Sequence, residues 1–311
     1  MTTTSISDAA AVEGPVRRSR SSLRRQLVGF AYTLPTLVFI VVFFLTPLVL
    51  VAKMSLSKYG LLTGDEGFNF PRNYVSVWRN QLFWPSVWFT IEYTILVTVL
   101  LLGLGLGLAL LVQTVSRWTA FLRTVFLLPV SLGLAAASLL AYGFYSPAIG
   151  PISPPLEALG LIDNPIAFLG TSLAALLSTT FLVVWKFAGF YMLVLTVGLQ
   201  GIPDDVYEAA SLDGASRWQT FRHITLPLLR PSLSLATILC VTGSLLAFDQ
   251  FFILTKGAPD NTTVTAVQVI YREAFQRQNL GTAAALSILV LVVLVLINAL
   301  QFRFLRGTER D

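Results

Sequence analysis

The chain has 311 residues, of which 55% are hydrophobic and only 12% carry a charge. Soluble globular chains are about 25% charged, so the 21 basic and 16 acidic side chains cannot cover a core this apolar. Most of the protein must therefore contact lipid. The single cysteine, Cys240, excludes a disulfide within the chain, and together with the single histidine, His223, it leaves no ligand set for a zinc site.

Six stretches of the sequence are long and apolar enough to cross a membrane. A spanning helix needs about 20 mainly apolar residues, because the hydrocarbon layer is about 30 Å thick. We therefore predict an all-α transmembrane fold with six spans. The predicted spans are 28–52, 87–112, 120–145, 171–198, 232–254 and 283–305.

The basic residues indicate the orientation of these spans. Cytoplasmic loops carry an excess of Lys and Arg. If both termini are cytoplasmic, 13 of the 21 basic residues lie inside, seven lie outside, and Lys186 lies within a span. We predict a disordered cytoplasmic tail over 1–27, a transmembrane domain over 28–305 and a cytoplasmic C-terminus over 306–311.

The sequence lacks the motifs that would indicate nucleotide binding or catalysis. No G-x-x-x-x-G-K-[ST] phosphate loop occurs, so the chain has no visible means of holding ATP. Gly103, Gly105 and Gly107 lie inside the second predicted span with no strand before them, which disfavours a dinucleotide site. Gly103 and Gly107 instead suit a small-residue packing face. No span contains a nucleophile with a base or a set of metal ligands, which argues against a membrane-embedded enzyme.

The connection between the fourth and fifth spans, residues 199–231, is the most informative segment. Pro203 suits a first helical position and Gly214 suits a left-handed cap, so we predict a helix over about 203–213. Ser216 and Gln219 have the spacing of a capping box, which indicates that a second helix begins there.

The predicted first helix carries small residues. Val206, Ala209 and Ala210 share one face in a helical projection, whereas Tyr207 and Glu208 point elsewhere. A face of small residues lets another surface approach closely. The alternative is a plain helical hairpin that packs under the bundle.

The residues of this connection have a recognisable spacing. They are Glu208-Ala209-Ala210, Asp213-Gly214-Ala215, Phe221, Ile224, Leu226-Pro227 and Pro231. The pattern resembles the EAA loop of bacterial ABC importer permeases of the carbohydrate-uptake branch. Downstream, Phe248-Asp249 and 254–259 resemble the family's F-D…L-T-x-G-G-P element, except that Ala258 replaces the second glycine. The similarity covers about residues 30–305.

This resemblance implies a fold, partners and a mechanism. It implies a six-span permease bundle in the bacterial cell membrane whose coupling helix docks on a separate ATPase. Further partners would be a second, homologous permease, a second ATPase copy and an extracytoplasmic solute-binding protein, with no nucleic acid. ATP and Mg²⁺ would be bound by the ATPases, so this chain would hold no cofactor and would not be an enzyme. The docking residues would be Glu208, Ala209, Ala210, Asp213, Gly214 and Ala215, flanked by Arg217 and Arg222.

Charged residues within spans mark a candidate substrate path. Each costs about 2.5–3.5 kcal/mol on insertion scales, so Lys186 and Asp249 call for a reason. They could line a water-filled path with neighbouring aromatic residues, although ordinary packing also explains the aromatics. Residue counting places Lys186 about 22 Å and Asp249 about 8 Å below the outer ends of their helices, which argues against assuming an ion pair. The candidate path residues are Trp185, Lys186, Phe187, Phe190, Tyr191, Phe248, Asp249 and Phe252.

The expected substrate is a sugar or a related polyol, and the alternatives are a glycerophosphodiester or glycerol 3-phosphate. A competing class is an ion-coupled secondary carrier or channel. Such a protein would contain inverted repeats and several buried carboxylates near the midplane. The sequence has no visible repeat and only one well-placed acid, Asp249.

Overall fold

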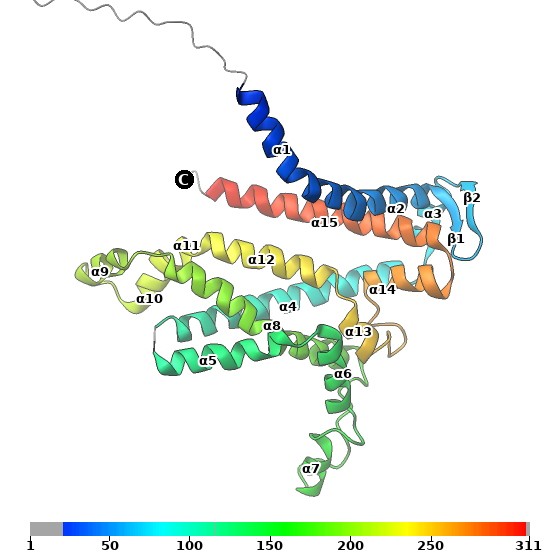
Figure 1. Cartoon of the computed structure of the whole chain (residues 1–311). Helices are drawn as coiled ribbons and strands as arrows, with labels where there is room; N and C mark the ends of the chain where they lie inside the picture. Colours follow the sequence, from blue (N-terminus) through cyan, green and yellow to red (C-terminus); the bar gives the residue numbers. More distant parts are fainter. Residues whose placement is uncertain (1–20, 115, 309–311) are drawn as a thin grey trace, which may run out of the picture. The chain divides into compact units, whose positions relative to one another are not determined.

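The computed structural model describes residues 21–114 and 116–308, and almost all of its regular structure is helical (Figure 1). The chain divides into two compact units, Met1–Leu50 and Val51–Asp311. In the described residues, five helices are long and apolar enough to cross a membrane, and one sharply bent pair supplies a sixth candidate. The prediction of an all-α transmembrane fold is confirmed. The candidate spans are Val28–Leu56, Phe83–Val112, Ser172–Gln200, Arg230–Leu254, Leu280–Arg303, and the bent pair Arg117–Ser131 with Leu134–Phe144.

The first unit contains α1 (Ser21–Ile40), the π-helical turn η1 (Val41–Leu45) and the beginning of α2 (Thr46–Leu56). Of the predicted tail, residues 1–20 lie outside the described part of the chain, and α1 begins at Ser21. The π turn ends two residues before Pro47, which has no amide hydrogen to donate to the helical ladder.

The third span is not the continuous helix predicted over 120–145. It consists of α5 (Arg117–Leu127), the 3₁₀ turn η2 (Leu128–Ser131) and α6 (Leu134–Phe144), and the two parts meet at 94°. Pro129 removes one amide donor, and Gly133 is extended with φ −62° and ψ 143°. A helix cannot continue through both features, so the span bends there.

The fifth span is also interrupted, between α12 (Arg230–Leu245) and α13 (Asp249–Leu254). By contrast, α4 (Phe83–Val112), α8 (Ser172–Gln200) and α15 (Leu280–Thr308) are continuous. The largest buried cluster joins α4, α8 and α12 through side chains such as Tyr93, Met192 and Cys240. These three helices form the core of the second unit.

The short helices between the fourth and fifth spans agree closely with the sequence. The first, α9, covers Asp204–Leu212, and Gly214 has the left-handed φ of +74° expected of a cap. Pro203 is the N-cap residue and not the first helical residue. The capping box of Ser216 and Gln219 is present and starts α10 (Arg217–Thr220), followed by η3 (Phe221–Thr225) and α11 (Leu226–Leu228).

The opposite end of the second unit holds a small hairpin that the sequence analysis missed. Strand β1 (Ser57–Gly60) pairs antiparallel with β2 (Gly64–Phe68), and α3 (Arg72–Arg79), α14 (Ala266–Tyr271) and η4 (Arg272–Gln276) lie nearby (Figure 1). Asn73 ties the hairpin to α3, because its amide donates to the carbonyls of Ser55 and Ser57 at 2.8 Å.

Helix α7 (Ser153–Ala158) lies in the connection between α6 and α8.

The glycines of α4 do not pack as predicted. A Cβ on Gly105 would lie 2.9 Å from the Cβ of Tyr191 in α8, whereas a Cβ on Gly103 or Gly107 would meet nothing within 4 Å. The close-packed glycine is therefore the middle one, and the predicted Gly103–Gly107 face makes no close contact with the described residues.

This difference gives a matched pair of substitutions in α4. Gly105→Ala should lower the thermal unfolding midpoint of the detergent-solubilised protein, since overpacking a tight contact costs about 1–3 kcal/mol. Gly103→Ala adds the same methyl group to open space and should leave the midpoint unchanged or slightly raised. Equal effects of the two substitutions would show that α4 and α8 do not approach at Gly105.

Candidate functional site

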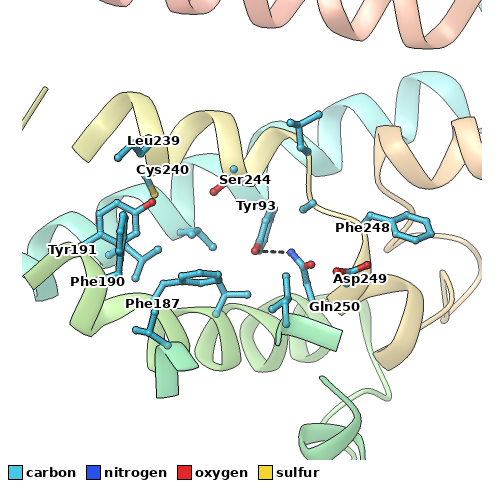
Figure 2. Close-up of a pocket in the computed structure, with 18 residues that line it drawn as sticks. Tyr93, Phe187, Phe190, Tyr191, Leu239, Cys240, Ser244, Phe248, Asp249 and Gln250 are labelled. Carbon is cyan, nitrogen blue, oxygen red and sulfur yellow. Dashed lines mark hydrogen bonds between the residues drawn. The ribbon is translucent and has the colours of Figure 1, made fainter. Parts of the chain in front are cut away.

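A cavity of about 640 Å³ lies within the second unit, between α4, α8, the bend of the third span and the break of the fifth. Figure 2 shows it extending from Phe190 and Tyr191 at one end to Phe248 and Asp249 at the other. The walls are mainly aromatic and aliphatic, as is typical of sites for small molecules.

The polar groups of the cavity gather beside the break in the fifth span. Gln250 and Tyr93 are both buried, and the Gln250 Nε2 donates to the Tyr93 Oη at 3.1 Å (Figure 2). The Gln250 Oε1 is also buried but has no hydrogen-bond partner among the described residues. Asp249 is exposed to the cavity next to it. The break between α12 and α13 brings these consecutive polar residues to the cavity wall.

Five of the eight predicted path residues line this cavity: Phe187, Phe190, Tyr191, Phe248 and Asp249. The other three, Trp185, Lys186 and Phe252, do not line it.

Each of these three side chains has another environment. Trp185 is 45% exposed and does not take part in the cavity wall. Phe252 stacks on Phe248 and contacts Tyr271, with ring centroids 5.0 Å apart in both pairs. Sequence reasoning also missed Tyr93 and Gln250. The one available signal was that Gln250 is a polar residue adjoining Asp249 inside a span.

Lys186 is only 3% exposed, and its side chain contacts the bend of the third span. Its Nζ donates to the backbone carbonyl of Leu132 and, at 3.3 Å, to that of Val130, and it lies 4.7 Å from the Phe187 ring centroid. No ion pair joins it to Asp249 or to another acid within the described side chains. Carbonyls that the broken helix leaves without an intrahelical partner thus attract this cation, which draws it away from the cavity.

The exposed face of α9 differs from the prediction. Ala210 is buried and Tyr207 is half-buried, with its hydroxyl 3.3 Å from the Thr225 Oγ1. Glu208 and Ala209 are exposed, and Leu212 is 89% exposed. The free surface therefore includes Glu208, Ala209 and Leu212, while Tyr207 and Ala210 face the bundle.

The remaining predicted docking residues continue this surface. Asp213, Gly214, Arg217 and Arg222 are exposed, and Ala215 is half-buried. Behind α9, a groove of about 1240 Å³ separates α9 and α10 from the ends of α4 and α8. The structure thus brings all eight predicted residues to one end of the unit.

Comparison with known proteins gives the family. Residues 100–310 match the model for the binding-protein-dependent transport system inner membrane component. The chain belongs to this family. As a permease subunit of an ABC importer, it is not an enzyme, and ATP is hydrolysed by partner subunits.

Relatives cover this permease almost from end to end. It is 30% identical over 93% of its length to the probable ABC transporter permease protein YurN of Bacillus subtilis strain 168, and the match covers 99% of that protein. It is 31% identical to the trehalose/maltose transport system permease protein MalF of Thermococcus litoralis, over 89% of this chain and 93% of that one.

A solved structure shares the fold of this permease. It belongs to a bacterial ABC transporter involved in the import of the acidic polysaccharide alginate, and the match has a TM-score of 0.82 with 22% identity. The alignment covers 92% of this chain and 98% of that one. At this identity the likeness establishes the fold of the permease and not its substrate.

The hydrogen bonds of Lys186 predict that its replacement lowers the stability of the protein. Lys186→Met keeps most of the apolar stem but leaves the carbonyls of Val130 and Leu132 without their donor, at about 1–3 kcal/mol for each buried group. We expect a clearly lower thermal unfolding midpoint in detergent. Lys58→Met is the control, because exposed ion pairs such as Lys58–Glu66 contribute only about 0–1 kcal/mol. A Lys186→Met protein as stable as the Lys58→Met protein would contradict the assignment.

Proposed function

We propose that this permease forms half of the translocation pathway of a carbohydrate importer. The observation that carries the proposal is the cavity among the spans, which combines aromatic walls with a few converging polar groups. Relatives named for trehalose and maltose, for multiple sugars and for lactose support a sugar as the substrate.

The cavity suits the chemistry of a sugar or a related polyol. A pyranose ring has hydroxyl groups around its edge and an apolar face of C–H groups. The Asp249 carboxylate is exposed to the cavity and accepts hydrogen bonds from hydroxyl groups. The aromatic side chains of Phe187, Phe190 and Phe248 provide apolar surfaces for the ring.

The exposed surface of α9 is the proposed docking element for the ATPase. Gly214 caps the last turn of α9, and the capping box of α10 follows immediately. A short helix with ordered ends transmits a displacement, whereas a loop would absorb it. ATP and Mg²⁺ are bound by the ATPase subunits in this scheme, and ATP-driven movement at α9 shifts the spans between inward-open and outward-open states.

The complete importer then contains this permease, a second permease of the same family, two ATPase copies and an extracytoplasmic solute-binding protein. A solved relative in complex with an alginate pentasaccharide-bound periplasmic protein supports such a partner. Within the second unit, α9 and the C-terminal end of α15 lie at the same end (Figure 1). That end also carries Arg217, Arg222 and Arg230, which supports a cytoplasmic C-terminus in a bacterial cell membrane. Six spans would place the N-terminus on the same side.

Uptake by the reconstituted importer tests the function. Proteoliposomes that contain this permease and its partners should accumulate radiolabelled maltose or trehalose only when ATP is present on the ATPase side. Accumulation that follows a proton or sodium gradient without the ATPase would support an ion-coupled carrier and contradict the proposal.

A substitution on α9 tests the docking surface separately. Ala209→Arg places a charge on the proposed contact without disturbing the buried side of the helix. It should weaken co-purification of the ATPase by more than about tenfold, since an unpaired charge buried in an interface costs well over 1.4 kcal/mol. Ala158→Arg makes the same change at an exposed position in α7 and should leave the complex intact. Normal ATPase binding by both variants would exclude this face of α9 from docking.

A further inference from the structure

The cavity contains one charged side chain. Among the residues that line it, only Asp249 carries a formal charge, and the others are aromatic, aliphatic or neutral polar. The Asp249 side chain is exposed and takes part in no ion pair among the described residues. The one formal charge on the cavity wall is therefore negative.

Two basic residues of neighbouring segments, Lys186 and Arg272, donate hydrogen bonds to other groups. Lys186 points its ammonium at the carbonyls of Val130 and Leu132. On the hairpin side, Arg272 donates to the Asn261 Oδ1 at 2.7 Å and to the Lys256 carbonyl at 2.8 Å. Neither cation lines the cavity, so neither is placed to bind an anion inside it.

The second polar feature of the cavity wall, the Gln250 side chain, is uncharged. The buried Gln250 amide donates to Tyr93 and leaves its Oε1 without a partner among the described residues. This amide adds no charge to the cavity wall, so Asp249 remains its one charged group. Hydroxyl groups of a solute donate to the Asp249 carboxylate, whereas a phosphate dianion or a carboxylate offers mainly acceptors.

We propose that Asp249 is a charge filter that makes this half of the pathway favour neutral polyhydroxylated solutes and reject anionic ones. The proposal rests on the proposed function and sharpens its substrate class. An anion that enters the cavity loses part of its hydration and meets an uncompensated carboxylate in a medium of low dielectric constant. Sugar phosphates, uronates and glycerol 3-phosphate are thereby disfavoured, while neutral sugars pass.

Charged thiol reagents measure this filter without knowledge of the natural substrate. Gly243 lines the cavity, and a Cβ there would meet nothing within 4 Å, so Gly243→Cys places a thiol in open space. The native thiol is removed by Cys240→Ala. In the purified importer complex, modification rates are measured with a cationic and an anionic methanethiosulfonate reagent, each divided by its rate with a free thiol in solution.

We expect the normalised rates to favour the cationic reagent by about tenfold, as in clefts lined by one sign of charge. Asp249→Asn should bring the ratio close to one, and Asp249→Glu should preserve it. Asp260→Asn, at an exposed position that does not line the cavity, is the matched control and should leave the ratio unchanged.

A ratio near one with Asp249 intact, or a preference that survives Asp249→Asn, would overturn the charge filter. Failure of both reagents to reach the thiol while an exposed control cysteine reacts would also overturn it, since solutes would then not meet this wall. The rates do not depend on transport. A complex that imports sugar with ATP but has a ratio near one therefore refutes the filter and leaves the proposed function standing.

Discussion

The need to satisfy backbone groups inside a membrane governs the architecture of the second unit. Lipid offers no hydrogen bonds, so a broken helix is tolerated only where other protein groups or water satisfy its freed carbonyls. The third span bends by 94° at Pro129 and Gly133. Lys186 of α8 reaches this bend and donates to two of its carbonyls. A buried cation thus stabilises the break from a neighbouring span.

That interaction also determines the character of the cavity. Val130 and Leu134, on either side of the carbonyl that Lys186 binds most closely, line the cavity wall. Because the ammonium is bonded to the carbonyls of the bend, it does not line the cavity. The break in the fifth span brings Asp249 and Gln250 to the wall of the same cavity. Two interrupted spans therefore create one cavity whose charged group is a carboxylate.

Local signals in the sequence were sufficient for part of this structure. Hydropathy located the spans because each is set by a length of apolar residues. The cap at Gly214 and the box at Ser216 were predictable because they involve only neighbouring residues. The bend at Pro129 was not, since proline also occurs within continuous membrane helices. The partners of Lys186, the Tyr93–Gln250 bond and the exposed face of α9 depend on packing between distant segments, so single-sequence reasoning could not assign them.

The central claim is that solute passes through this cavity in an importer driven through α9. A cryo-electron microscopy map of the complete complex, prepared with a neutral disaccharide and a non-hydrolysable ATP analogue, tests it most directly. The account predicts sugar density against Phe187 and Phe248, within reach of Asp249, and α9 seated on the ATPase. Sugar density confined to a region that none of the cavity residues lines, or an ATPase that contacts the permease away from α9, would contradict the account.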